Sequence, residues 1–113
     1  MIEIYGIKNC NKIRDTLRWF EDHNVDFTFR DVKKQPIEAE KLADYVYKIG
    51  LDVMVNKRGM KWKQLGLGKK NLSDEELFEE MLKNQTMIKR PLIVKGEAVM
   101  VGYDEDAFEE FIN

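Results

Sequence analysis

The order of apolar patterns along the chain constrains its fold more than any other feature of the sequence. Residues 2–7 alternate between apolar and polar side chains, which is typical of a strand with one buried face. Residues 13–20 instead place Ile, Leu and Phe at helical spacing, and Asn24 can adopt the left-handed conformation that ends a helix. A second alternating stretch follows at 25–30. The chain is therefore predicted to begin with a strand, a helix and a strand.

The middle of the chain has the patterns of helices. Residues 42–49 carry an apolar stripe of helical period, which Gly50 ends. Residues 52–70 are interrupted by three glycines and predict short helical turns rather than one long helix. Ser73 is followed three residues later by Glu76, which is the pattern of a capping box at the start of another helix.

The last third of the chain returns to strand patterns. Residues 91–94 and 98–101 are apolar and are separated by Lys-Gly-Glu, which predicts a hairpin. Asp104 can cap a final helix that buries Phe108 and Phe111. The whole order is β-α-β, then helices, then β-β-α.

This order predicts an α/β fold, namely a thioredoxin-like β-α-β/β-β-α core with a helical insert between its halves. The chain has 113 residues, enough for one domain over 1–113 that buries a core without disulfides, and the insert would span about 38–86. No apolar run approaches the roughly 20 residues of a membrane helix, and the start lacks a signal-peptide pattern, so we expect a cytoplasmic protein. The net charge of -2 argues against a nucleic-acid binder.

Cys10 is the only cysteine and lies between the first predicted strand and the first predicted helix. A lone cysteine is more often a small buried apolar residue than a reactive group. The position of Cys10 favours a reactive thiol instead. A sulfur at a helix start faces unpaired N–H groups and the positive end of the helix dipole, and both favour thiolate over thiol. Lys8 and Lys12 add positive charge on either side. We therefore predict that Cys10 is a nucleophile.

Four short motifs occur in order along the chain. They are YGIKNCNKIR near the start, NKRGMKWKQLGL at 56–67, MIKRPLIV at 87–94 and VGY at 101–103. Together they resemble the arsenate-reductase-like family of thioredoxin folds, which includes glutaredoxin-linked arsenate reductases, YffB-like thiol reductases and Spx-type transcription regulators. The resemblance covers nearly the whole chain, and the detailed pattern is most similar to the YffB-like branch.

The resemblance implies which residues surround the thiol. In the family, one arginine on the helical insert and another just before a proline reach the thiol, and the matching motifs give Arg58 and Arg90. A guanidinium fork can hold an oxyanion or a carboxylate by paired hydrogen bonds and can steady a neighbouring thiolate. Pro91 resembles the proline that is cis in thioredoxin folds and presents backbone to a substrate, whereas an isolated proline there would simply start a strand. Lys12 is expected to help bind substrate, and Lys89 is expected to be solvated.

Two departures from the family pattern bear on chemistry. Ile13 stands where a Cys-x-x-Cys dithiol would have its second cysteine, so only an external thiol can resolve an intermediate on Cys10. The redox-switch form of the Spx regulators is then unavailable. Arsenate reductases also carry a third arginine after the final hairpin, where this chain has VGYDED. This departure argues against arsenate itself as the physiological substrate.

The sequence favours a cytoplasmic thiol-dependent reductase in which the Cys10 thiolate is the nucleophile. Glutathione or a glutaredoxin-like protein would resolve the intermediate, and the substrate would be a small oxyanion or a disulfide. Glutathione would act as co-substrate, with no bound cofactor and no metal. The competing interpretation is an Spx-like regulator that binds RNA polymerase and performs no chemistry. The missing second cysteine and the sparse basic surface outside 56–70 favour the enzyme, and neither interpretation involves direct contact with nucleic acid or a membrane.

Overall fold

A four-stranded sheet organises the computed structural model, which describes residues 1–113, and its strand order is β2-β1-β3-β4. β1 (Ile2–Gly6) pairs parallel with β2 (Phe27–Asp31) and antiparallel with β3 (Leu92–Lys95). β3 pairs antiparallel with β4 (Ala98–Val101) in the predicted hairpin. α1 (Asn11–Asp22) provides the crossover that a parallel pair of strands requires. The predicted α/β fold is confirmed.

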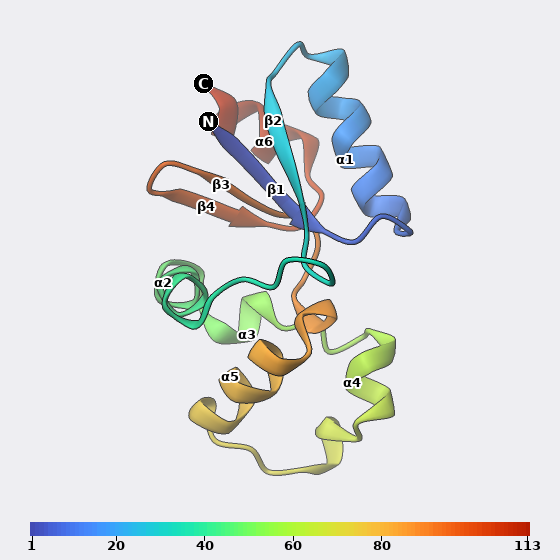
Figure 1. Ribbon diagram of the computed structural model, residues 1–113, viewed down its shortest axis with the longest axis vertical. Helices are drawn as coiled ribbons and strands as arrows, with labels where there is room; N and C mark the ends of the chain where they lie inside the picture. The colour runs from blue at the N-terminus through green and yellow to red at the C-terminus, as the bar shows by residue number, and fades with distance from the viewer.

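The chain between β2 and β3 is helical, and α6 (Glu105–Ile112) follows the hairpin. Figure 1 shows this helical segment beyond the end of the sheet at which β1 finishes, while α1 and α6 lie beside the strands. None of the helices has both the length and the apolar character needed to cross a membrane. The segment consists of α2 (Ala39–Ile49), α3 (Leu51–Met54), α4 (Met60–Gln64), the 3-10 turn η1 (Leu67–Lys69), α5 (Asp74–Lys83) and the 3-10 turn η2 (Gln85–Met87).

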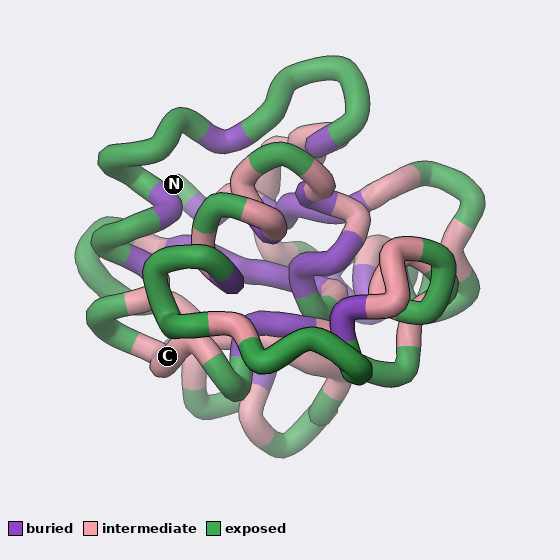
Figure 2. The backbone as a smooth tube through the Cα atoms, turned by 90° about the horizontal axis from the view of Figure 1, so that it is seen from below, coloured by how far each residue is buried: buried purple, intermediate pink, exposed green.

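Two apolar clusters pack on opposite faces of the sheet, because neighbouring strand residues point to opposite sides. Figure 2 shows the buried segments running through the centre of the molecule, with the exposed turns around them. The first cluster joins the sheet to the insert and includes Tyr5, Leu92, Val94, Leu42, Tyr45, Met54 and Met81. The second cluster joins the sheet to α1 and α6 and contains Ile2, Ile4, Ile93, Trp19, Phe20 and Phe108.

Local signals decide where the helices begin and end. Asn24 has a φ of 55°, as predicted for the residue that ends α1. The N–H of Val25 then donates to the carbonyl of Phe20 at 3.0 Å, which closes the helix end. β2 consequently begins at Phe27, two residues later than the predicted strand, because Val25 still belongs to the helix cap.

The start of α1 is packed closely against the end of β1. Ile13 is 1% exposed, and its side chain fills the space in which a β-carbon on Gly6 would lie. A larger residue at this strand end would therefore displace the first turn of α1. Because Gly6 has no side chain, the first turn of α1 packs directly on β1. The residues between β1 and α1, Cys10 among them, lie at the carboxyl end of β1, where open α/β sheets bind their ligands.

Candidate functional site

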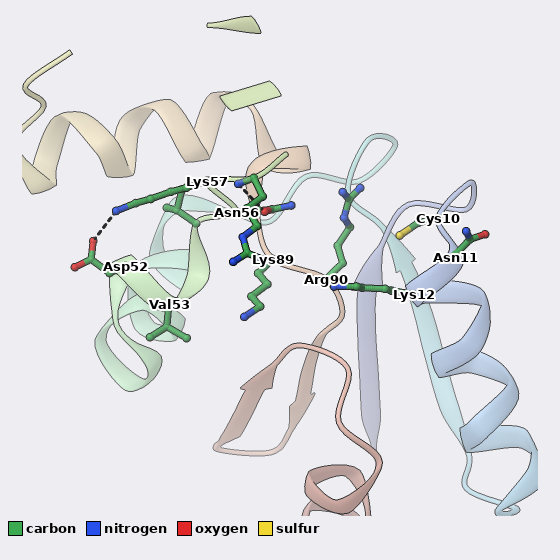
Figure 3. Close-up of a pocket in the computed structure, with 11 residues that line it drawn as sticks. Cys10, Asn11, Lys12, Asp52, Val53, Asn56, Lys57, Lys89 and Arg90 are labelled. Carbon is green, nitrogen blue, oxygen red and sulfur yellow. Dashed lines mark hydrogen bonds and ion pairs between the residues drawn. The ribbon is translucent and has the colours of Figure 1, made fainter. Parts of the chain in front are cut away.

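Cys10 is the residue immediately before α1 and is half-buried. Its backbone is extended, and its carbonyl accepts the N–H of Arg14 at 3.0 Å. Its side chain makes no capping hydrogen bond, so the expected contact of sulfur with the N–H groups of the first turn is not seen. Figure 3 instead shows the sulfur of Cys10 pointing toward the Arg90 side chain. The thiol is thus available to a ligand in the space beside it.

That space is a pocket of about 740 Å³ between the start of α1, the 52–58 segment and the residues just before β3. It brings together four of the five predicted site residues, Cys10, Lys12, Arg58 and Arg90, which come from three separate parts of the chain. The complete lining is Cys10, Asn11, Lys12, Asp52, Val53, Val55, Asn56, Lys57, Arg58, Lys89 and Arg90.

Pro91 is the one predicted site residue that does not line this pocket. It is buried, and the Arg90–Pro91 peptide bond is cis, as the resemblance implies. The carbonyl of Pro91 accepts the N–H of Gly102 at 2.9 Å, so the structure gives that carbonyl a partner within the protein. Pro91 therefore lies behind Arg90 rather than on the surface of the pocket.

A short antiparallel pairing brings the two predicted arginines to one pocket. Val55 and Ile88 form an isolated β-bridge, and hydrogen bonds flank it on both sides. The N–H of Asn56 donates to the carbonyl of Met87 at 2.7 Å, and the N–H of Lys89 donates to the carbonyl of Met54 at 2.7 Å. This pairing fixes the segment that precedes Arg58 alongside the segment that leads to Arg90.

The NKRG motif is a tight turn at the rim of the pocket. The side-chain oxygen of Asn56 accepts the N–H of Arg58 at 3.1 Å, and the carbonyl of Asn56 accepts the N–H of Gly59 at 3.3 Å. Asparagine commonly stabilises such turns by bonding to the backbone two residues ahead. The turn fixes the backbone of Arg58 and leaves its long side chain exposed at the pocket.

Two further cations line the pocket that the sequence interpretation did not assign to the site. Lys89 is exposed, as expected for a solvated side chain, and it lines the pocket together with Lys57. Lys57 forms an ion pair of 3.6 Å with Asp52, and its amino group lies 5.9 Å from the centre of the Trp62 ring. Lys57 and Lys89 directly precede the two predicted arginines in the motifs NKRG and KRP. This adjacency is the feature of the sequence that could have identified them as pocket residues.

The residues after the final hairpin, 102–106, serve the fold. Asp104 accepts the N–H of Ala107 at 3.2 Å and caps α6. The hydroxyl of Tyr103 donates to Glu105 at 2.6 Å, and this hydrogen bond raises the pKa of Tyr103 to about 12. No residue of this segment lines the pocket.

A family model described as ArsC family matches residues 5–111, which is almost the entire chain. The chain belongs to the ArsC family. Among relatives, it is 34% identical over 113 residues to the protein YusI of Bacillus subtilis, covering 96% of each chain. It is 26% identical over 114 residues to the global transcriptional regulator Spx 1 of Oceanobacillus iheyensis, covering 99% of this chain and 87% of the relative.

Solved structures of ArsC-type proteins have the same fold. The structure named YFFB (PA3664) protein matches with a TM-score of 0.90 and 30% identity, covering 97% of both chains. An arsenate reductase from Vibrio cholerae matches with a TM-score of 0.83 and 25% identity, covering 96% of this chain and 95% of the other. The predicted relationship to arsenate reductases, YffB-like proteins and Spx regulators is confirmed.

Proposed function

We propose that this ArsC-family protein is a cytoplasmic thiol-dependent reductase whose nucleophile is Cys10 and whose second thiol comes from glutathione or a glutaredoxin-like protein. The observation that carries the proposal is the shared pocket, in which a half-buried thiol lies among five cationic side chains and one carboxylate. Positive charge near a cysteine favours the thiolate, which is the reactive form. Arg58 and Arg90 supply forks suited to carboxylate or oxyanion groups.

The reaction proceeds in two thiol–disulfide exchanges. The Cys10 thiolate attacks one sulfur of a disulfide such as oxidised glutathione, a new S–S bond forms to Cys10, and the departing sulfur leaves as a thiolate that takes a proton from water. An external thiolate then attacks the sulfur bonded to Cys10 and regenerates the Cys10 thiolate. One half of the substrate is then a free thiol, and the other half leaves as a mixed disulfide with the external thiol. A second external thiol reduces that mixed disulfide, so complete reduction of one substrate disulfide oxidises two external thiols and leaves the protein unchanged.

Cys10 has no partner thiol within the chain, so the first exchange should stop at a stable adduct. Incubation with oxidised glutathione should add one glutathionyl group to the intact mass, and a glutaredoxin should remove it faster than glutathione alone. Cys10→Ser should fold normally and gain no mass. In this incubation, a main product in which Cys10 of two copies of the chain are joined by a disulfide would refute this reductase, and so would turnover by Cys10→Ser.

Arsenate is a poor candidate for the physiological substrate, because the third arginine of the arsenate reductases has no equivalent here. In the same assay, arsenate should be reduced slowly or not at all. Brisk arsenate reduction by a protein that resists glutathionylation would exclude the disulfide-directed mechanism.

The relationship to Spx regulators supports one alternative, a protein that binds RNA polymerase without catalysis. Affinity capture from lysate separates the two functions. Recovery of polymerase subunits favours the regulator, whereas glutaredoxin trapped as a mixed disulfide with Cys10 favours the reductase.

A further inference from the structure

Cys10 lies where two pockets meet. The pocket of about 740 Å³ shares Cys10 and Arg90 with a second pocket of about 470 Å³. The second pocket shares Lys33, Lys61 and Thr86 with a third of about 250 Å³. The three adjoining pockets are called the groove below. A small oxyanion, comparable in size to a few water molecules of about 30 Å³ each, would fill only a minor part of it.

The groove is strongly positive although the whole chain has a net charge of -2. Asp52 is the only acidic residue in its lining, and its partner Lys57 is the only groove cation in an ion pair. Seven cations without a carboxylate partner therefore lie along one path, and a ligand with several negative charges would relieve their mutual repulsion. These seven are Lys12, Lys33, Arg58, Lys61, Lys83, Lys89 and Arg90.

The lining favours a polypeptide over a nucleic acid. No aromatic side chain lines any of the three pockets, whereas proteins that bind single strands stack bases on aromatic rings. Ile7 and Met60 instead give the second pocket an apolar surface beside the thiol, and Met60 is 75% exposed. Flexible methionine side chains of this kind adapt to varied apolar partners.

We propose that the groove binds an acidic polypeptide segment carrying an oxidised cysteine, so that the substrate of the proposed reductase is a peptide or protein disulfide flanked by Asp and Glu. This inference rests on the proposed function and specifies its substrate class. Acidic side chains on both sides of the substrate cysteine pair with the groove cations, and an apolar neighbour contacts Ile7 and Met60. The Cys10 thiolate attacks the substrate sulfur, an S–S bond forms between them, and the original partner of that sulfur leaves as a thiolate.

Short cysteine peptides of equal length test this assignment when each is supplied as a mixed disulfide with the coloured leaving group thionitrobenzoate. Their flanks are acidic, neutral or basic, and the rate of thionitrobenzoate release is measured in a single turnover. At low salt the acidic peptide should react at least about tenfold faster than the neutral peptide. The preference should shrink at high salt, because the charges are screened.

Charge-reversal substitutions in the second and third pockets test peptide binding in the groove separately from the chemistry of Cys10. Lys33→Glu/Lys61→Glu/Lys83→Glu should lower the acidic-peptide rate to about the neutral-peptide rate. The matched control Lys63→Glu/Lys69→Glu/Lys70→Glu changes the same charge on nearby residues outside the groove and should keep the preference. If the first variant does not fold, the corresponding Lys→Gln variant should still reduce the preference.

The outcomes distinguish the groove from the reductase. Equal rates for acidic and neutral peptides, with oxidised glutathione still reacting at Cys10, overturn the groove assignment alone. An oligonucleotide of equal charge that displaces the acidic peptide more effectively than a second acidic peptide also overturns it. Failure of Cys10 to react with oxidised glutathione and with every peptide refutes the proposed function itself.

Discussion

Cys10 shares its pocket with two kinds of cation, and they differ in the shape of their charge. Lys12 carries a compact ammonium, whereas Arg90 carries a planar fork that can bind a carboxylate through two parallel hydrogen bonds. Figure 3 shows Lys12 extending toward the Arg90 segment from the start of α1. If positive charge alone were enough to bind the substrate, Lys12 and the neighbouring lysines would supply that charge. Substitution of Arg90 therefore tests whether the planar guanidinium is needed.

Arg90→Lys should lower kcat/KM for oxidised glutathione nearly as far as Arg90→Ala does, because an ammonium cannot reproduce the paired hydrogen bonds. Losing a hydrogen bond to a charged group costs about 1.5–3 kcal/mol, which corresponds to a fall of about tenfold to a hundredfold. The matched control is Arg18→Lys, an exposed position on α1 that does not line the pocket. Wild-type kcat/KM in Arg90→Lys would show that a point charge is enough.

At the scale of the element, α5 depends on a reciprocal cap. The N–H of Glu76 donates to the hydroxyl of Ser73 at 3.2 Å, and the N–H of Ser73 donates to the Glu76 carboxylate at 3.0 Å. The backbone and side-chain hydrogen bonds from Ser73 hold the pKa of Glu76 below its ordinary value. A lowered folded pKa means that this stabilisation is complete above the unfolded pKa and is lost as the pH falls through the folded one.

Ser73→Ala should lower the free energy of unfolding at pH 7 by about 1 kcal/mol, as removal of a helix cap does. Glu76→Gln should be less stable than wild type at neutral pH, and the difference should vanish in acid, where wild-type Glu76 is also uncharged. Urea unfolding at pH 7 and at strongly acidic pH measures both effects. A difference between Glu76→Gln and wild type that is independent of pH would contradict the assigned role of the carboxylate.

Such element boundaries were predictable because their causes are local. Asn24 ends α1 in the left-handed region, Gly50 ends α2 with a φ of 108°, and Asp104 caps α6. Each of these residues acts on backbone groups within a few positions of itself. Their chemistry is therefore visible in a short stretch of sequence, and the elements that they delimit are found in the structure.

The composition of the site was predictable only where a motif marked it. Arg58 and Arg90 were identified by resemblance, but the Val55–Ile88 bridge that aligns their segments joins residues more than thirty positions apart. No periodicity in the sequence signals such a pairing. The participation of Lys33 and of other cations in the groove has the same cause, because loops that are distant in sequence meet only in the folded chain.

At the scale of the whole molecule, one sheet separates two apolar clusters. Strand residues alternate between them, so that Tyr5 faces the insert cluster and Ile4 faces the α1 and α6 cluster. Each cluster also has its own reporter, because Trp19 belongs to the second cluster and Trp62 packs against the first. Since β1, β3 and β4 contribute side chains to both clusters, neither cluster can keep its strands in place when the other unfolds.

The two clusters should unfold in one transition. Single-tryptophan variants, Trp62→Phe to observe Trp19 and Trp19→Phe to observe Trp62, should give fluorescence transitions that coincide with circular dichroism of the same variant. Adding Phe108→Ala, which empties the second cluster, should destabilise either background by about 3–5 kcal/mol. A Trp62 transition that stays in place while Phe108→Ala shifts circular dichroism would show that the insert unfolds separately.

The close fit of Ile13 against Gly6 has a kinetic consequence for the proposed reductase. The position where a resolving cysteine would stand is occupied by Ile13, which is buried against Gly6. Release of the adduct on Cys10 therefore depends on collision with another molecule that carries a thiol. The lifetime of that adduct is then inversely proportional to the concentration of the external thiol. When the thiol pool is depleted, the modified protein accumulates, and its abundance becomes a readout of how reducing its surroundings are.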